Sequence, residues 1–229
     1  MPVTLLPLKK SDTFYQSAES QFLDAWKHPD KPEPTVKRIF YVLHQSPDAQ
    51  LHLHRHANYA YVAFVTLRRI NPFDCDRISR HVGVDNVEML FHGTKRSCQL
   101  WDSKNKIHPC DRADCHLCSV LKFSYNPHYS KPDNWFGVGI YSSATSSKAD
   151  NWIQSTHPDT DYKVMLLNNV VVGRTKMKYR KAVGITGPPT GYDSISGATK
   201  DQGGFLNYPE TVVFNADAIC VNSVIVYEN

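Results

Sequence analysis

The sequence has no long hydrophobic run. No stretch approaches the roughly 20 apolar residues needed to cross a membrane, and Pro7 interrupts the apolar start of MPVTLLPLKKSD. We therefore expect no membrane span, no standard secretion signal, and an intracellular location, cytoplasmic or nuclear. Internal repeats, low-complexity segments and flexible Ser/Gly linkers are also absent from the sequence, which favours a single domain over residues 1–229.

No charge of one sign dominates the composition. The chain has 26 Lys and Arg against 22 Asp and Glu, a formal net charge of +4, and its 41% hydrophobic residues suit an ordinary globular core. The positive charge is uneven, because RTKMKYRK (174–181) contains five basic residues and no acidic one. This basic stripe could bind phosphate, although a solvated strand face is the commoner meaning of such a run. Its members are Arg174, Lys176, Lys178, Arg180 and Lys181.

Helix and strand signals alternate in residues 1–58, which we interpret as a lead-in to the domain. Ser11 or Asp12 can cap a helix and Pro29 can end it, because apolar residues recur between them at spacings of three and four. The segment YAYVAFVTLRRI (59–70) is typical of a strand.

Strand signals dominate from about residue 87 onward. We predict strands in three segments that are rich in β-branched and other apolar residues: VEMLFHGT (87–94), KVMLLNNVVVG (163–173) and ETVVFNADAICVNSVIVYE (210–228). Together with the N-terminal helix they predict the α+β fold class.

Cysteines are crowded rather than spread along the chain. Four of the six lie within residues 98–118, whereas Cys75 and Cys220 stand alone. The Cx11Cx4CxxC pattern predicts a tetrahedral zinc site in a small insert, and four thiolates would leave no open position for a catalytic water. His108 or His116 could replace a cysteine, and disulfides are the remaining alternative. The predicted ligands are Cys98, Cys110, Cys115 and Cys118.

A second histidine group occurs in HLHRH (52–56). In a helix His52 and His56 would share a face while His54 would not, and no other ligand type is nearby. We therefore expect surface histidines here and no metal.

Three other residues carry potential chemistry, although each alone is more often structural. His92 ends an apolar strand directly before Gly93 and Thr94, where a side chain can point into a cleft. Tyr141 lies on a predicted strand, and Glu210 opens the apolar run ETVVF. A carboxylate in that position is either solvent-facing or part of a site.

The stretch NWFGVGIYSSATSSKADNW (134–152) combines glycines, hydroxyls and large aromatics. Gly137 and Gly139 permit a close approach of the backbone to another group, and a flat ligand is the best candidate. The run from Ser142 to Ser147 is too polar for a buried strand.

The chain resembles the catalytic domain of the poly(ADP-ribose) polymerase family in the order and spacing of four motifs: LFHGT, FGVGIYSSATSSKADNW, YDSISG and ETVVF. The resemblance covers about residues 59–228 and is greatest to mono-ADP-ribosylating members and to fungal proteins with a cysteine-rich insert. It implies the split antiparallel sheet of the ADP-ribosyltransferase fold and NAD as co-substrate. It also implies a catalytic triad of His92, Tyr141 and Glu210.

The resemblance further implies a role for each site residue. Glu210 would stabilise the oxocarbenium ion that forms when the bond from nicotinamide to ribose breaks. Tyr141 and Trp152 would sandwich the nicotinamide ring. The expected contacts to NAD come from His92, Gly93, Thr94, Gly139, Tyr141, Ser147 and Trp152.

One position departs from the family pattern. Ala149 stands where a serine commonly binds the nicotinamide amide, with Ser146 and Ser147 close by in sequence. Either a neighbouring hydroxyl replaces it, or NAD binds more weakly by about 0.5 to 1.5 kcal/mol.

The function expected from the sequence is mono-ADP-ribosyl transfer from NAD to a protein or nucleic acid, with release of nicotinamide. The alternatives are a non-catalytic module that binds NAD or nucleic acid on the same fold, and an NAD glycohydrolase. We expect a monomer that does not bind membranes.

Overall fold

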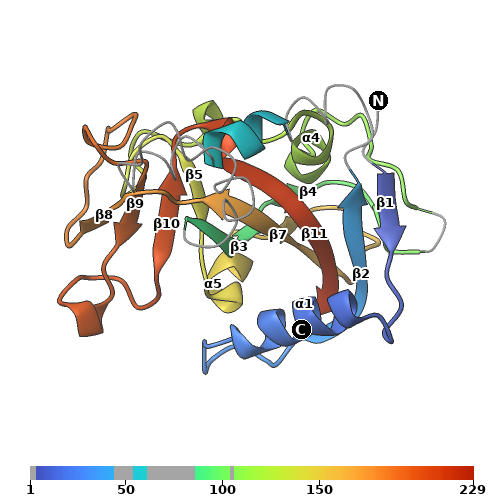
Figure 1. The fold of residues 1–229 in the computed structure, drawn as a ribbon. Helices are drawn as coiled ribbons and strands as arrows, with labels where there is room; N and C mark the ends of the chain where they lie inside the picture. Colours follow the sequence, from blue (N-terminus) through green and yellow to red (C-terminus); the bar gives the residue numbers. More distant parts are fainter. Residues whose placement is uncertain (1–3, 44–53, 61–85, 104–105) are drawn as a thin grey trace.

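Apolar strands from both ends of the chain pair in one five-stranded antiparallel sheet. In the computed structural model, which describes residues 4–43, 54–60, 86–103 and 106–229, its order is β1-β2-β11-β7-β3 (Figure 1). The strands are β1 (Thr4–Pro7), β2 (Thr35–Leu43), β3 (Val87–Gly93), β7 (Lys163–Val171) and β11 (Ile219–Glu228). The supposed lead-in therefore supplies two strands of the main sheet.

A second sheet has the order β5-β10-β9-β8 and is antiparallel except for the β8–β9 pair. It joins the first sheet where Phe91 and Ser143 exchange backbone hydrogen bonds of 2.8 and 3.0 Å. A short parallel pair, β4 with β6, completes the strands. Their bounds are β4 (Lys95–Arg96), β5 (Ile140–Ser142), β6 (Gln154–Ser155), β8 (Thr175–Lys178), β9 (Ser194–Gly197) and β10 (Glu210–Val213).

Helices cover both faces of the five-stranded sheet (Figure 1). Helices α1 (Thr13–Asp24) and α5 (Ser146–Asp150) lie on one side, and α4 (His116–Phe123) lies on the other. Residues 54–60 are also helical. The 3-10 turns are η2 (Pro127–Tyr129), η3 (Lys200–Gln202) and η4 (Ala216–Ala218). Mostly antiparallel sheets with separate helices confirm the α+β class.

Strand β7 contributes to two hydrophobic cores, one on each face of the sheet. Leu166 packs in the core that contains Leu117 of α4, whereas Met165 packs in the core that contains Phe22 of α1. Because successive side chains of a strand point to opposite faces, a strand covered on both sides must be apolar throughout. This explains the two apolar runs of the strand segment, 164–167 and 170–172.

Two predicted elements differ from the structure. The segment 210–228 is two strands in different sheets, β10 and β11, because Asn215 accepts a hydrogen bond from the N–H of Asp217 and turns the chain. The predicted strand 59–70 begins in the helix of residues 54–60, and its remainder lies outside the described residues.

Helix α1 begins at the predicted position, directly after Asp12, but it ends at Asp24, before the predicted end at Pro29. Asp12 occupies the N-cap position, but its carboxylate accepts the N–H of Lys9 (2.8 Å) instead of capping the helix. In the described part of the chain, no helix has the length and apolar character needed to span a bilayer.

Candidate functional site

A cavity of about 760 Å³ lies beside the junction of the two sheets. The end of β3, strand β5, helix α5, the start of β10 and the segment after α4 contribute to its lining. Of the residues predicted to contact a ligand, seven line it: His92, Gly93, Thr94, Gly139, Tyr141, Trp152 and Glu210. Residues far apart in sequence therefore meet around one cavity.

The ring orientation of His92 is fixed by a backbone contact. Its Nδ1 lies 2.7 Å from the carbonyl oxygen of Tyr141, and because a carbonyl can only accept, Nδ1 carries the proton. Burial lowers the pKa of His92, and the hydrogen bond with the Tyr141 backbone opposes this effect. A neutral imidazole with Nε2 as acceptor follows. The ring of Tyr125 packs edge-on against it, with 5.0 Å between the centroids.

The hydroxyl of Tyr141 holds the glycine-rich loop that precedes it. It donates to the carbonyl of Gly137 (2.8 Å) and accepts the N–H of Phe136 (3.0 Å). Gly137 has a φ of +77°, and a Cβ there would lie 1.9 Å from the carbonyl oxygen of Ile185. The loop needs glycine at this position for its backbone conformation and its packing. Burial raises the pKa of Tyr141 to about 12, so the phenol stays protonated.

Glu210 begins β10 with a buried carboxylate. Its Oε1 lies 3.5 Å from the Nζ of Lys148, which also donates to the carbonyl of Tyr208 at 2.9 Å. Burial raises the pKa of Glu210, while the positive charge of Lys148 opposes the rise. Lys148 also lines the cavity and was not singled out from the sequence. The only sequence signal for Lys148 was its place among the hydroxyl-bearing residues that form helix α5.

Helix α5 is fastened by hydrogen bonds to α1 and to the segment that follows α1. The hydroxyl of Ser146 donates to the carbonyl of Phe22 (2.7 Å), and that of Ser147 accepts the N–H groups of Lys27 (2.9 Å) and His28 (3.2 Å). Ser147 does not line the cavity, so its predicted contact with a ligand has no support in this geometry. Neither hydroxyl is placed to substitute for the serine that Ala149 replaces.

As expected, the polar run 142–147 is not a buried strand, because β5 ends at Ser142 and α5 begins at Ser146, but most of its hydroxyl side chains are buried. Ser142, in β5, is buried, as are Ser143, Ser146 and Ser147. Backbone groups satisfy three of these hydroxyls; that of Ser143, for example, donates to the carbonyl of Pro209 (2.7 Å). Hydrogen bonds to backbone groups of distant segments therefore offset the burial of three of the four hydroxyls, whereas that of Ser142 has no partner among the described residues.

Gly93 and Gly139 have packing roles in addition to lining the cavity. A Cβ on Gly93 would lie 2.0 Å from the carbonyl oxygen of Ala149, and one on Gly139 would lie 2.4 Å from Cγ1 of Val212. The first glycine lets β3 approach α5, and the second lets β5 approach β10. Trp152, just after α5, keeps 60% of its surface exposed at the cavity.

The four predicted cysteine ligands form one cluster. Their sulfur atoms all lie within 4.8 Å of one another, and Sγ of Cys98 lies 3.6 Å from that of Cys118 and 3.7 Å from that of Cys115. Four sulfurs around zinc at about 2.3 Å would be about 3.8 Å apart, whereas a disulfide needs about 2.05 Å. No disulfide joins the four cysteines of the cluster. The cluster is thus compatible with a metal such as zinc.

Backbone groups and helix α4 support the cysteine cluster. The N–H of Ser97 points at Sγ of Cys115 (3.4 Å), and the N–H of Cys110 points at Sγ of Cys118 (3.3 Å). Such donors favour thiolates over thiols. Cys115 and Cys118 flank the first turn of α4, and His116 of the same turn lines the cavity. The cluster therefore anchors one wall of the cavity.

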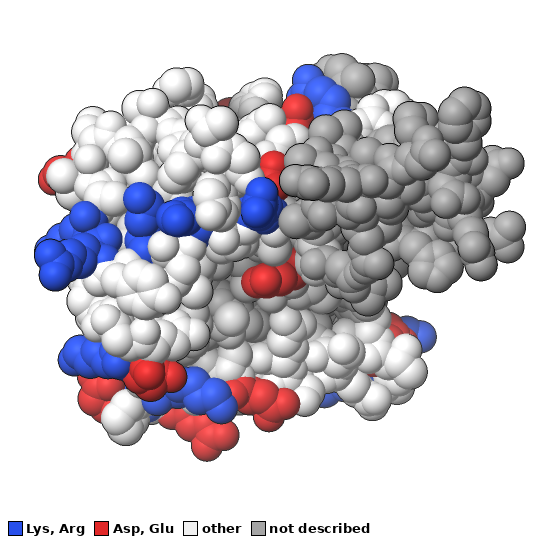
Figure 2. Space-filling view, turned by 60° about the vertical axis from the view of Figure 1, so that its left-hand side comes forward, with Lys and Arg blue, Asp and Glu red and all other residues white. Residues whose placement is uncertain are grey.

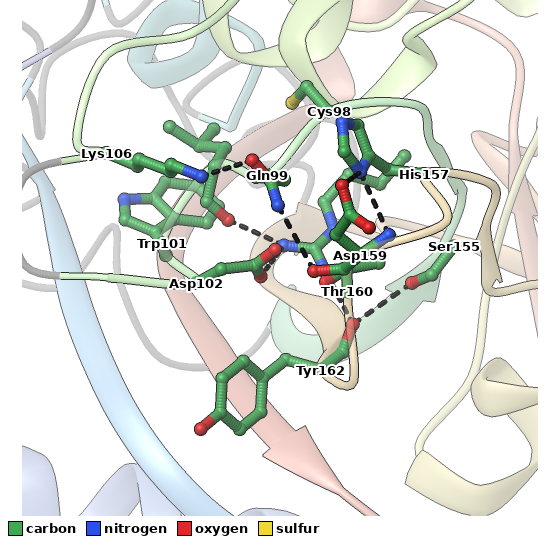
Figure 3. Close-up of polar contacts among 12 residues, drawn as sticks. Cys98, Gln99, Trp101, Asp102, Lys106, Ser155, His157, Asp159, Thr160 and Tyr162 are labelled. Carbon is green, nitrogen blue, oxygen red and sulfur yellow. Dashed lines mark hydrogen bonds and ion pairs between the residues drawn. The ribbon is translucent and has the colours of Figure 1, made fainter.

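A buried arginine ties the cysteine-rich segment to the loop before β7. Arg96 is 1% exposed, and its guanidinium donates to the carboxylate of Asp102 (2.7 Å), the hydroxyl of Thr160 (2.6 Å) and the carbonyl of Tyr162 (Figure 3). Gln99 extends the network by donating to the carbonyl of Asp159 (3.1 Å). Sequence reasoning missed this arginine, because a basic pair such as Lys95 and Arg96 gives no sign that one member is buried.

We expect Arg96→Ala to lower the free energy of unfolding by about 3 kcal/mol, since it removes one partner of a buried ion pair. Urea denaturation in buffers of equal metal content would measure this change. Arg112→Ala is the matched control, because Arg112 pairs with Asp114 at the surface. Equal midpoints for the two variants would contradict a structural role for Arg96.

The histidines near residue 54 differ from the expectation. His56 is buried, and its Nδ1 lies 2.9 Å from the carbonyl oxygen of Asp217, so the prediction of a surface side chain is wrong for this residue. His54 is exposed, and His52 lies outside the described residues. A helical segment packed on the sheet buries one of its faces, which composition alone does not identify.

Comparisons with known proteins do not assign the chain to a family. No family model matches it, and no curated protein matches it either. The geometry of the cavity and the motifs in the sequence are therefore the features that bear on function.

Proposed function

We propose that this chain is an NAD-dependent mono-ADP-ribosyltransferase with the split-sheet ADP-ribosyltransferase fold. The observation that carries the proposal is the meeting of His92, Tyr141 and Glu210 around one cavity, with Trp152 at its edge. These residues come from four separate segments of the chain, and their types suit cleavage of a glycosidic bond to a flat aromatic leaving group.

In the proposed reaction the bond between the nicotinamide nitrogen and the anomeric carbon of ribose breaks, and its electron pair leaves with nicotinamide. The carbon becomes cationic and then bonds to the acceptor, which loses a proton. The carboxylate of Glu210 would stabilise the developing positive charge, because the attraction is strongest in the transition state. A buried site strengthens that attraction relative to water.

The other lining residues would orient the donor. Nε2 of the neutral His92 can accept a hydrogen bond from a ribose hydroxyl, and the backbone of Gly93 can pair with the nicotinamide carboxamide. The faces of Tyr141 and Trp152 would provide stacking for the ring. A volume of about 760 Å³ is in the range of small-molecule sites.

The cysteine cluster would hold a structural zinc ion. Cys98, Cys110, Cys115 and Cys118 would be its ligands, and the ion would cross-link the segment before α4 with the start of that helix. Because four thiolates complete a tetrahedral shell, the contribution of the ion is to folding.

Ala149 predicts weak binding of nicotinamide. It supplies no hydroxyl, and the hydroxyls of Ser146 and Ser147 are hydrogen-bonded to α1 and to the segment after α1, respectively. We expect NAD affinity below that of a site with a serine at this position, by a factor of about 2 to 12.

Incubation with labelled NAD and a panel of proteins, RNA and DNA tests the proposal. Labelling of an acceptor with stoichiometric release of nicotinamide would support it. Nicotinamide release with free ADP-ribose as the sole product would indicate a glycohydrolase. Binding of NAD without release would indicate a non-catalytic module, and no binding at all would overturn the proposal.

We expect Trp152→Ala to weaken NAD binding by about 2-fold to 12-fold, which is the contribution of one aromatic pair beyond buried area. The melting temperature should hardly change, because the side chain is 60% exposed. Calorimetric titration and thermal unfolding would measure the two effects. Unchanged affinity would remove Trp152 from the binding site. Tyr179→Ala is a matched control, since that ring is 55% exposed and does not line the cavity.

Lys148→Met is expected to move the acid limb of the pH–rate profile to higher pH. The reaction needs ionised Glu210, so activity falls as pH falls through the pKa of Glu210. That pKa is raised by burial and held down by Lys148. Removing the positive charge raises it further, so protonation begins at higher pH. The profile of kcat/KM for nicotinamide release, compared with Lys10→Met, would reveal this shift, and an unmoved limb would contradict the coupling.

A further inference from the structure

The basic stripe of residues 174–181 occupies an edge of the second sheet. Within the described residues, β8 pairs with β9 alone, so its other edge is open. Arg174 and Lys176 both lie over the ring of Tyr192, at 5.4 and 5.0 Å from its centroid. Of the basic residues, Lys176 and Lys178 lie in β8 itself (Thr175–Lys178), and because alternate residues of a strand share one face, their side chains leave the same face about 6.6 Å apart.

The stripe continues onto the rim of the cavity. The Nζ of Lys181 lies 4.5 Å from the centroid of Trp135, and the N–H of Ala182 donates to the carbonyl of Trp135 (2.7 Å). Trp135 lines the cavity and is 42% exposed. The segment after the stripe also pairs with the rim, since the N–H of Gly184 donates to the carbonyl of Pro132 (2.9 Å). A ligand that follows the stripe would therefore arrive at the cavity.

Charge and aromatic exposure coincide on this surface. None of the five basic side chains forms an ion pair with another described residue. Asp193 is the nearby acid, and its carboxylate accepts the backbone N–H of Arg174 (2.8 Å). The ring of Tyr179, inside the stripe, is 55% exposed. Figure 2 brings this side of the molecule forward and shows lysine and arginine side chains gathered on its left.

We propose that the basic stripe, with Tyr179 and Trp135, binds single-stranded nucleic acid and delivers it to the cavity as the acceptor of ADP-ribose. The role of the strand as acceptor rests on the proposed function, whereas its binding to the stripe does not. A row of cations without acidic partners suits the repeating phosphates of an extended nucleic-acid strand, and exposed rings offer stacking to unpaired bases. An acidic peptide would use the cations but would leave the rings without a stacking partner.

Lysines on an edge strand also protect a sheet from edge-to-edge association, and this role predicts no affinity for nucleic acid. Binding of fluorescein-labelled 12-nucleotide single-stranded RNA and DNA, a hairpin duplex and an acidic peptide separates the two explanations. Anisotropy would be measured without NAD at several salt concentrations. Five phosphate contacts predict a slope of log K against log salt of about −3.5.

The variant Lys176→Ala/Lys178→Ala/Arg180→Ala should bind single strands at least 10-fold more weakly and reduce the steepness of the salt slope by about 2. The matched control Lys9→Ala/Lys10→Ala/Lys27→Ala removes the same charge from the segments flanking α1. Trp135→Ala should lower affinity about 10-fold and leave the slope unchanged, because stacking releases no counterions. Melting temperatures would establish that the variants fold.

Equal losses in the stripe variant and the control would overturn the inference, as would tighter binding of the acidic peptide or the duplex. Labelling of the bound strand by NAD supports the acceptor role, and its absence while a protein is labelled overturns that role. Because the binding assay contains no NAD, a failure of strand binding can be told apart from a failure of the NAD-dependent reaction. Nicotinamide release without strand binding contradicts this inference alone, and strand binding without nicotinamide release contradicts the proposed function.

Discussion

Glu210→Gln is expected to lower the rate of nicotinamide release by about 100-fold to 1,000-fold, or about 3 to 4 kcal/mol of transition-state stabilisation. The amide keeps the shape of the side chain but loses the charge that would oppose the oxocarbenium ion. Because ground-state NAD has little positive charge to lose at the anomeric carbon, its affinity should remain nearly intact. Turnover at saturating NAD and calorimetric affinity, measured side by side, separate the two effects.

Glu88→Gln is the matched control for this substitution. Glu88 lies in β3, the strand that carries His92, but does not line the cavity. Equal activity of Glu210→Gln and the wild type would remove Glu210 from the mechanism. Lost affinity with unchanged turnover would recast it as a residue that holds ribose, which suits a binding module.

Loss of the metal is the second change with a large expected effect. We expect about one zinc per chain, and Cys98→Ser or Cys115→Ser should lose the metal and lower solubility. Zinc binding by four cysteines is worth about 10 to 16 kcal/mol in small domains and is coupled to folding. Helix α4 and the cavity wall that it supplies should therefore become disordered. Elemental analysis and circular dichroism, before and after chelation, would measure these effects.

Cys220→Ser provides the control for the cysteine variants. Cys220 is buried in β11 and does not belong to the four-cysteine cluster. This variant should keep a full complement of metal even if its stability changes. A wild-type protein without metal, or with disulfides among the four cysteines, would exclude the zinc site.

The local pattern of the sequence was sufficient for several elements. Apolar spacing predicted α1, and β-branched runs predicted β3 and β7, because burial on one or both faces dictates residue type along each element. The crowding of Cys98 to Cys118 likewise predicted a cluster that the structure confirms as a group of neighbouring sulfurs. Cysteines separated by few residues along the chain cannot lie far apart in space.

Interactions between distant segments decided what the sequence left open. The segment 210–228 is rich in apolar residues on both sides of Asn215, yet it enters two sheets, because β10 pairs with β9 and β5 whereas β11 pairs with β2 and β7. The sequence does not record these partners, since pairing depends on strands up to about 200 residues away in the chain.

The sequence by itself determined which residue types were available: a strand-end histidine, a carboxylate before an apolar run and four crowded thiols. Tertiary structure decided their surroundings, such as the burial of Arg96, the approach of Lys148 to Glu210 and the hydrogen bonds that occupy Ser147. The physical reason is that solvent exclusion and partner distance set pKa and hydrogen bonding, and both arise only when segments far apart in the chain pack together.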